Sequence, residues 1–311
     1  MRIDLHSHST VSDGTEPPDV VVAQARANGV DVLALTEHDV APWLDPAARR
    51  GWLAALDAAA RCQVTLVPGA EVSCHWWDHG MRRSAHLLAL LFREDDALRA
   101  ALGGVLRSRS TRMEEMVARI VADRGPVISL TDVLAVARRA EVPVGSDPRG
   151  SRGDPVLGRP HLAQALADTG LCTYEEAFGD EWLGSGGPYY VRKASVPLEE
   201  AVGLVREAGG VTVLAHPGRR GYHVPDPLIR RLADAGLDGI EANHPWHDAA
   251  ERTRLTRLGA DCGLLVTGGS DYHGAFKAER LGERLTDPEV YFSLVALAAD
   301  RGGLGPVPPG E

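Results

Sequence analysis

The feature that most constrains the fold is an alternation of short apolar runs with longer segments of helical pattern. Residues 30–36 (VDVLALT) are typical, because a continuous apolar run of this length predicts a strand that is buried on both faces. Strands that alternate with helices predict a parallel sheet with crossover helices. The expected strands are residues 2–5, 30–36, 64–67, 85–92, 211–215, 238–242 and 264–267. Seven such strands favour an α/β fold, a distorted seven-stranded (β/α)7 TIM-like barrel, over an open sheet.

The alternation is interrupted in the middle of the chain. Helices are expected at residues 17–28, 45–61, 197–208, 227–235 and 248–261. Between about residue 95 and residue 188 the sequence is rich in helical pattern, Arg and Gly, and residues 141–160 have the composition of a loop. We therefore expect a discontinuous barrel of residues 1–94 and 189–285, an inserted helical subdomain or lid of residues 95–188, and a C-terminal helix and tail of residues 286–311.

Composition narrows the class of protein. A length of 311 residues is normal for one α/β barrel with an insertion. The formal charge of −10 argues against a broad nucleic-acid-binding surface but leaves room for a small basic pocket. No signal peptide or membrane-spanning run is recognisable, and the four cysteines have no CxxC spacing. These features predict a cytoplasmic protein without membrane contact.

Nearly every expected strand carries a histidine or a carboxylate at its C-terminal end. His6 and His8 follow the first strand, and in an extended segment such a pair points to one side. Barrel enzymes build their active sites at this end of the strands. So many ligand types on one rim favour a metal site over isolated surface or core histidines. The residues are His6, His8, Asp13, His38, Glu71, His86, His216, Asp271 and His273.

The donor set indicates which metals to expect. Nitrogen and carboxylate oxygen donors without sulfur suit divalent zinc, manganese or iron. Nine ligands are too many for one ion. With three or four protein ligands per ion and one bridging carboxylate, they serve two or three metals.

The same segments resemble the PHP (polymerase and histidinol phosphatase) superfamily of metal-dependent phosphoesterases. LHSHSTVSDGT, LTEHD, PGAEVS, a strand-borne histidine, LAHPGR and GSDYHG occur in this order. The resemblance implies three metals at the mouth of a seven-stranded barrel. It assigns one metal to His6, His8, Glu71 and Asp271, a second to Glu71 as the bridge with His86 and His216, and a third to Asp13, His38 and His273.

Two departures from the family pattern bear on these ligands. Glu37 stands where the family more often has Asp, at a position that is not an expected ligand. His75 and His79 lie between Glu71 and His86 and are alternatives to His86 at the second metal. We expect His86, because it lies within a strand that leads to the rim.

A smaller resemblance points to a branch of the family that acts on nucleotide phosphates. GRPHLAQAL at 158–166 and HPGRR at 216–220 are similar to nucleoside 3′,5′-bisphosphate and AMP phosphatases and to a related 5′-to-3′ exoribonuclease. By this resemblance Arg159, His161 and Arg219 contact the substrate phosphate, and guanidinium groups suit that role. The alternatives are a loop arginine without a ligand for Arg159 and a capping or core role for His161.

The expected reaction is hydrolysis of a phosphate monoester of a small nucleotide through a metal-bridging hydroxide, without a stable nucleic-acid partner. The expected catalytic residues are Asp13, Arg159, His161 and Arg219, and His244 is expected to line the substrate pocket. Other enzymes that fit are an exoribonuclease-type phosphodiesterase, a histidinol-phosphate-type phosphatase and an amidohydrolase. A PHP module that binds metal without hydrolysis is the alternative that is not an enzyme.

Two further interpretations concern charged residues near the ligands. Asp4 and Asp39 sit beside ligands, and we expect them to orient imidazoles. Arg107, Arg109 and Arg112 form a basic helical stretch, which predicts a solvated face, with a lid contact as the alternative. The exact substrate, the metal and the oligomeric state are left open by the sequence.

Overall fold

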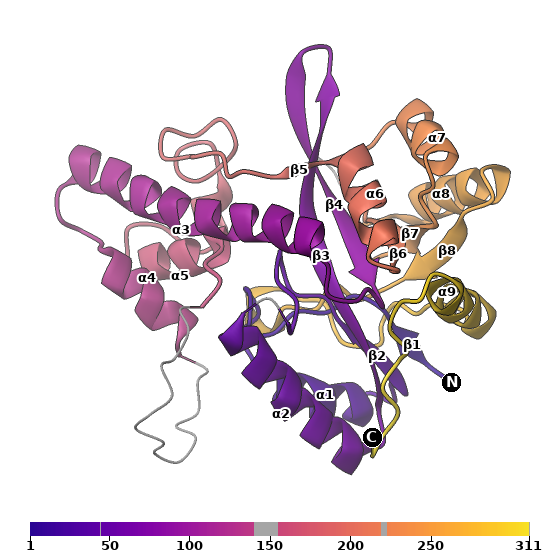
Figure 1. Ribbon diagram of the computed structural model, residues 1–311. Helices are drawn as coiled ribbons and strands as arrows, with labels where there is room; N and C mark the ends of the chain where they lie inside the picture. The colour runs from indigo at the N-terminus through magenta and orange to yellow at the C-terminus, as the bar shows by residue number, and fades with distance from the viewer. Residues whose placement is uncertain (44, 140–154, 219–222, 311) are drawn as a thin grey trace.

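The computed structural model describes residues 1–43, 45–139, 155–218 and 223–310. Its centre is a nearly closed sheet in the strand order β1-β2-β3-β4-β6-β7-β8, with a short strand β5 paired to β3 (Figure 1). A parallel bridge between Ser7 and Tyr272 joins the two ends of this order. The strands are β1 (Ile3–Asp4), β2 (Val32–Leu35), β3 (Thr65–Asp78), β4 (Met81–Leu90), β5 (Val196–Pro197), β6 (Val211–Ala215), β7 (Gly239–Asn243) and β8 (Leu265–Gly268).

The predicted α/β barrel is confirmed, but one strand runs in an unexpected direction. β4 pairs antiparallel with both β3 and β6, whereas the other pairs along the barrel are parallel. β3 also continues well beyond residue 67, where its apolar run stops. Beyond that point buried apolar side chains such as Val72 and Cys74 alternate with Glu71 and Ser73. This alternation is the pattern of a strand with two different faces, so β3 and β4 form a long hairpin.

The helices surround the barrel on the sides that the alternation predicts. α1 (Pro18–Ala27) and α2 (Pro46–Cys62) pack on each other beside β1 and β2, while α8 (Ala249–Asp261) packs on β7 and β8. The other helices around the barrel are α6 (Leu198–Glu207), α7 (Asp226–Asp234) and α9 (Pro288–Asp300). Within the part of the chain that the structure describes, no helix has both the length and the apolar character needed to cross a membrane.

The segment between β4 and β5 forms a second hydrophobic core of its own. It contains α3 (Asp96–Arg124), α4 (Leu130–Ala137), α5 (Arg159–Asp168) and the 3-10 helix η1 (Glu176–Phe178). Met113, Met116, Leu162 and Trp182 belong to this core, which is distinct from the clusters of the barrel. The long helix α3 extends from the barrel into this helical group (Figure 1). The insert is thereby held close to the barrel mouth.

Candidate metal centre

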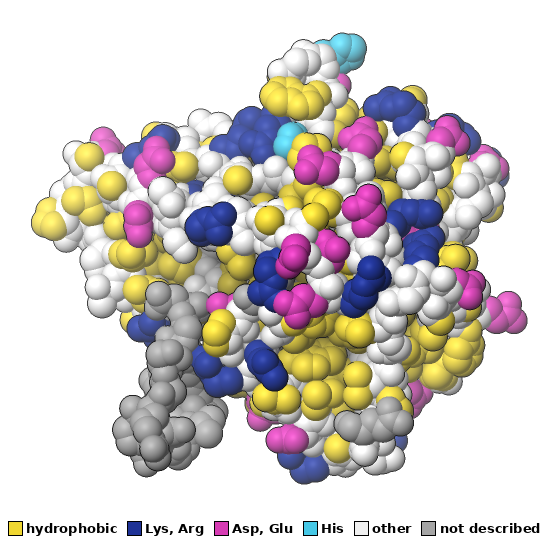
Figure 2. Space-filling model, viewed as in Figure 1, with side chains coloured by type: hydrophobic (Ala, Val, Ile, Leu, Met, Phe, Trp, Pro, Cys, Tyr) yellow, Lys and Arg dark blue, Asp and Glu magenta, His cyan; other side chains and the backbone are white. Residues whose placement is uncertain are grey.

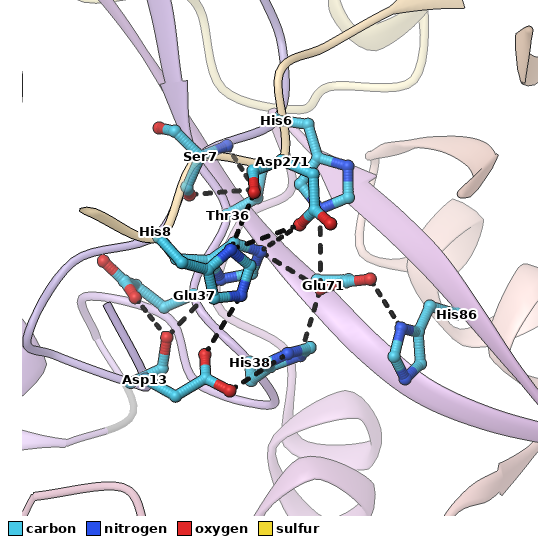
Figure 3. A network of polar contacts seen from close by, with 12 residues as sticks. His6, Ser7, His8, Asp13, Thr36, Glu37, His38, Glu71, His86 and Asp271 are labelled. Carbon is cyan, nitrogen blue, oxygen red and sulfur yellow. Dashed lines mark hydrogen bonds and ion pairs between the residues drawn. The ribbon is translucent and has the colours of Figure 1, made fainter. Parts of the chain in front are cut away.

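Glu71 lies at the centre of a buried cluster of histidines and carboxylates at the barrel mouth (Figure 3). One carboxylate oxygen, Oε1, is 2.6 Å from His86 Nδ1 and 2.9 Å from His216 Nε2. The other oxygen, Oε2, is 3.1 Å from His38 Nδ1 and 3.2 Å from His8 Nε2. The two oxygens therefore face different groups of histidines. This is the geometry that a carboxylate shared by two cations requires.

His6 and His8 direct the same ring atom at the same two carboxylates. His6 Nε2 is 3.4 Å from Glu71 Oε2 and 3.4 Å from Asp271 Oδ1. His8 Nε2 is 3.2 Å and 3.3 Å from the same two oxygens. Ser7, between the two histidines, turns the other way and donates a hydrogen bond to the carbonyl oxygen of Ala34. Local extended geometry thus brings the residues of the first predicted ligand set around one point.

The residues of the other two predicted sets lie beside the first. His273 Nε2 is 3.4 Å from Asp13 Oδ1, and His38 Nε2 is 3.7 Å from Asp13 Oδ2. His8 belongs to this group as well as to the first, and His38 also groups with Glu71 and His86. The nine residues form one connected cluster. Their role as ligands and their allocation to individual ions remain predictions.

Several buried polar atoms of the cluster have no hydrogen-bond partner among the described residues. They include His6 Nε2, His8 Nε2, Asp13 Oδ1 and Glu71 Oε2. Unpaired buried polar atoms are costly, so several of them facing common points fit bound cations. Burial lowers the pKa of His8, but its contacts with Asp271 and Glu71 raise that pKa to about 9. The carboxylates thus stabilise positive charge at this place, and divalent metal ions would supply that charge in place of protons on the imidazoles.

Glu241 on β7 is a positioning residue that the sequence patterns do not single out. Its Oε1 lies 3.0 Å from His6 Nδ1, and its Oε2 accepts a hydrogen bond from the backbone N–H of His216 at 2.9 Å. A carboxylate on Nδ1 holds the imidazole so that Nε2 faces the cluster. One feature of the sequence could have indicated this role, because Glu241 lies between the apolar residues Ile240 and Ala242 of an expected strand. A buried carboxylate without a partner is destabilising, so a carboxylate at such a position predicts a polar or cationic partner.

Three residues at the cluster have left-handed backbone conformations that side-chain-bearing residues seldom adopt. They are Asp39 (φ 60°), His216 (φ 29°) and Asp271 (φ 51°). Such conformations cost free energy and persist where the surrounding structure imposes them. Asp4 contributes to this constraint, because its Oδ1 accepts a hydrogen bond from the backbone N–H of Ser270 next to Asp271. Asp4 therefore holds backbone, and the prediction that it orients an imidazole is wrong.

A cavity of about 380 Å³ opens from the cluster toward the insert. The side of the cavity that faces the cluster of histidines and carboxylates is lined by Asp13, His38, His86 and His273. Within the described ranges, the cationic side chains of its lining are Arg82, Arg109, Arg112, Arg159, Arg192, Lys193 and Lys277. Its aromatic lining consists of Tyr174, Phe178, Tyr190, Trp246 and Phe276. A cavity with potential metal ligands on one side and guanidinium and ammonium groups around it suits an anionic ligand.

The expectation of a solvated face is wrong for Arg109 and Arg112, whose side chains are buried against the pocket. Arg109 Nη2 is 2.6 Å from Asp39 Oδ2, and Lys193 Nζ is 3.3 Å from the same oxygen. Asp39 thus holds two cations at the pocket and does not orient an imidazole. Burial would raise the pKa of Asp39, but Lys193 and Arg109 hold it below its usual value. The face became buried because α3 lies along the pocket.

The structure places Arg159 on the pocket wall and His161 behind it. Arg159 Nη1 donates a hydrogen bond to the carbonyl oxygen of Leu183 at 3.2 Å, and its guanidinium lies 5.7 Å from the ring centre of Tyr190. His161 is buried, and its Nδ1 accepts a hydrogen bond from the backbone N–H of Gly158 at 3.0 Å. His161 therefore has the capping role that was its alternative. Burial lowers its pKa to about 4, so the imidazole is neutral near pH 7.

Gly158 explains why the start of α5 can approach the cluster. A side chain at this position would place its Cβ 3.0 Å from Asp13 Oδ2. A larger residue here would press the Asp13 carboxylate away, so glycine lets the backbone that precedes Arg159 pass close to it without displacement. Arg219, the other predicted phosphate contact, lies outside the described residues.

Three further histidines are placed clearly by the structure. His244 is fully buried with its Nε2 3.6 Å from Asp271 Oδ2, and it does not belong to the described lining of the pocket, so its contact with substrate stays a prediction. His79 lies exposed at the hairpin turn, and His75 Nδ1 is 3.1 Å from Ser195 Oγ. Neither of these two lies in the cluster around Glu71, whereas His86 does.

Comparison with known proteins adds a family to this geometry. Residues 4–109 match the model of the PHP domain. The chain is 33% identical over 277 residues to the phosphoribosyl 1,2-cyclic phosphate 1,2-diphosphodiesterase of Eggerthella lenta, covering 88% of this chain and 94% of that protein. It is 32% identical over 277 residues to the 3′,5′-nucleoside bisphosphate phosphatase of Chromobacterium violaceum, covering 88% of this chain and 87% of that protein.

A solved structure supports the same relationship at the level of the fold. A Bifidobacterium adolescentis protein, assigned as a metal-dependent phosphoesterase, superposes with a TM-score of 0.80 and 32% sequence identity. The match covers 95% of this chain and 96% of that one, so it includes the insert as well as the barrel.

Proposed function

This chain belongs to the PHP family of metal-dependent phosphoesterases, and we propose that it hydrolyses the phosphate monoester of a small nucleotide, a nucleoside 3′,5′-bisphosphate or AMP. The observation that carries the proposal is the pocket itself. Among the described residues, potential metal ligands, seven cations and five aromatic rings converge on one cavity of about 380 Å³. Metal ions and cationic side chains bind a phosphate group, and the aromatic rings offer an apolar surface on which a nucleobase can stack.

We assign the binding of two or three divalent ions of manganese, zinc or iron to the nine-residue cluster, with Glu71 as the shared ligand. Metals in such a site act as Lewis acids on the phosphoryl group and activate water for in-line attack. Glu241 and the strained backbone at His216 and Asp271 hold the imidazoles and carboxylates in place before metal arrives.

In this proposal, cationic side chains of the protein also bind the substrate phosphate. Arg109 and Lys193, both held by Asp39, lie beside the cluster and would neutralise phosphate oxygens that the metals leave free. Lys277 Nζ is 3.0 Å from Asp271 Oδ2 and 4.6 Å from the ring centre of Trp246, so it too lies where the scissile group would meet the barrel. The neutral His161 positions α5 through Gly158 and is not the acid in this scheme.

We further propose that residues 95–188 act as a lid over the substrate. The pocket takes Arg109, Arg112, Arg159 and Tyr174 from this segment, while its metal-binding floor comes from the barrel. A separate hydrophobic core gives the segment the rigidity to hold these side chains together. Closing a reaction site from both sides excludes water other than the attacking molecule.

The test is phosphate release by the purified, metal-loaded protein. Adenosine 3′,5′-bisphosphate and AMP are compared with ribose 5-phosphate and histidinol phosphate, in Mn²⁺, Zn²⁺ and Fe²⁺ in turn. The proposal expects the highest kcat/KM for one of the two adenine nucleotides, because only they offer a base to the aromatic lining. Equal rates with ribose 5-phosphate, or no release from either nucleotide while metal analysis shows bound ions, would contradict it.

A further inference from the structure

Glu279 is an acidic side chain in a pocket whose described lining is mostly cationic. On the face that Figure 2 shows, acidic and cationic side chains lie interspersed over the surface. In the described part of the pocket lining, by contrast, the acidic side chains are Asp13 and Glu279, beside seven cationic ones. Asp13 is a predicted metal ligand, whereas Glu279 forms no ion pair with any described residue. A carboxylate repels a phosphate group at close range, so its presence here indicates contact with another part of the ligand.

One oxygen of this carboxylate is fixed by a hydrogen bond. Trp246 Nε1 donates to Glu279 Oε1 at 2.6 Å. The Trp246 ring is itself packed on both cationic and aromatic groups, because Lys277 Nζ lies 4.6 Å from its centre and the ring of His244 lies 5.0 Å away. Glu279 is therefore held in a defined position in the pocket before any ligand binds.

The second oxygen of Glu279 lacks a partner. Oε2 is buried and has no hydrogen-bond partner among the described residues, although the side chain as a whole is only half-buried. A buried acceptor that is left unpaired costs free energy, and a donor that arrives with a ligand would recover it. An ionised carboxylate only accepts hydrogen bonds, so the matching group is an O–H or N–H donor.

The place of Glu279 relative to the metal centre selects the donor. The Trp246 ring, whose N–H contacts Glu279, lies 5.6 Å from the ring of the predicted ligand His216. The Lys277 ammonium over that ring is also 3.0 Å from Asp271 Oδ2. One indole ring thus separates Glu279 from the cluster. In a nucleotide the sugar is attached directly to the phosphate and the base lies beyond the sugar. With the phosphate at the metals, the donors nearest to Glu279 are therefore the hydroxyl groups of the sugar.

We propose that Glu279 is a specificity-determining residue that accepts a hydrogen bond from a ribose hydroxyl group and so selects ribonucleotides over deoxyribonucleotides. The inference rests on the proposed function, since it places a nucleotide phosphate at the metal centre. Carboxylates bind ribose hydroxyl groups in the same way in dinucleotide-binding sites. A hydroxyl donor is neutral, so its hydrogen bond to Glu279 leaves the cations of the pocket available for phosphate.

Glu283 supplies a matched control. It follows Glu279 in the same segment between the 3-10 helix η2 (Gly274–Phe276) and α9. Its side chain is exposed and does not belong to the described lining of the pocket. Glu283→Ala therefore removes the same charge from the same segment without touching the proposed acceptor, whereas Glu279→Ala removes that acceptor.

The experiment measures kcat/KM for phosphate release by the metal-loaded protein. Adenosine 3′,5′-bisphosphate and AMP are compared with their 2′-deoxy counterparts and with 3′-deoxy-AMP. Wild type should lose roughly tenfold or more when one hydroxyl is removed, because a hydrogen bond to a charged group contributes on this order. In Glu279→Ala the same removal should cost less than about threefold, while Glu283→Ala should keep the wild-type ratio. A general loss of activity through a shift of Trp246 cancels in this ratio.

Two analogues identify the donor that Glu279 binds. If removal of the 2′-hydroxyl is the costly change, a 2′-fluoro nucleotide should behave like the deoxy one in wild type, because fluorine cannot donate a hydrogen bond. Purine ribonucleotide, which lacks the 6-amino group of adenine, tests a base donor instead. If loss of that amino group is costly in wild type and harmless in Glu279→Ala, Glu279 binds the base and the inference is overturned.

Failure of this inference can be told apart from failure of the proposed function. If wild type hydrolyses the adenine nucleotides but hydroxyl removal costs wild type and Glu279→Ala equally, the sugar contact is refuted and the proposed function stands. An equal loss of the ratio in Glu283→Ala also refutes it, because the effect would then come from general charge. If no nucleotide is hydrolysed by the metal-loaded protein, the proposed function itself fails and the sugar contact fails with it.

Discussion

Two parts of one pocket differ in charge and in how they are built. The barrel side carries carboxylates and histidines that lie within β3 and β4, as Glu71 and His86 do, or in segments that follow other strands. The insert side contributes arginines from α3 and α5, which reach the same cavity because a separate helical core holds them there. The barrel side is suited to metals and the cationic side to the anion that metals act on. The comparison teaches that sequence motifs can predict the residues on the barrel side of such a pocket, whereas the cations on the insert side become recognisable only in the folded structure.

The most severe test of the barrel side is Glu71→Gln. Glu71 contacts five histidines through two oxygens, and the amide would offer one neutral oxygen in place of a charged bridge. We expect kcat to fall on the order of a thousandfold, together with loss of bound metal. Metal content by mass spectrometry and phosphate release by colorimetry would be measured on the same samples. Full metal content with near-normal turnover would contradict the proposed role of Glu71 as the ligand shared by the metals.

A smaller effect is expected one step away from the cluster, at Glu241. Glu241→Gln weakens the hold on His6 Nδ1 without removing a predicted ligand. Carboxylates in this position typically contribute about ten- to a hundredfold to metal affinity. Titration of metal against a chelator of known affinity would measure the change, and circular dichroism would verify the fold. An unchanged metal affinity would show that Glu241 is only structural.

The cationic side is tested by Asp39→Asn. The change leaves Arg109 and Lys193 without their shared carboxylate, so both cations lose their fixed positions. We expect KM for a nucleotide substrate to rise about tenfold, with a smaller change in kcat, since an ion contact to the substrate is affected and not the metal cluster. Steady-state kinetics would separate the two constants. A fall in kcat at constant KM would place Asp39 with the barrel side instead.

The mildest effect should come from pH. Burial and Arg109 lower the pKa of Lys193 to about 7. The ammonium is therefore present below pH 7 and is lost as pH rises through 7, so anion binding should weaken and KM should rise a few-fold between about pH 6.5 and 8. In Lys193→Arg this part of the pH dependence should disappear, because guanidinium keeps its charge. An identical pH profile in both proteins would rule out Lys193 as the titrating group.

The sequence could indicate where several residues of the cluster lie because local rules place them, while their role as ligands stays a prediction. The HxH at His6 and His8, the histidine after β2 and the Asp271–His273 pair each follow a strand, and strand ends meet at one rim. The length of β3 was missed because the continuous apolar run ends at Pro68, while an alternating pattern continues. Glu241 was missed because it carries no motif of its own, only a buried place in β7.

What the sequence determined by itself was the barrel, its ring of nine candidate ligands and the presence of an insert, since periodicity and strand ends are short-range features of a chain. Only the tertiary structure decided that Arg109 and Lys193 share Asp39, that His244 lies behind Asp271, and that His86 and not His75 reaches Glu71. These facts depend on segments far apart in the sequence that pack against one another. No local pattern records which buried charges will meet, because their pairing is set by the packing of the whole chain.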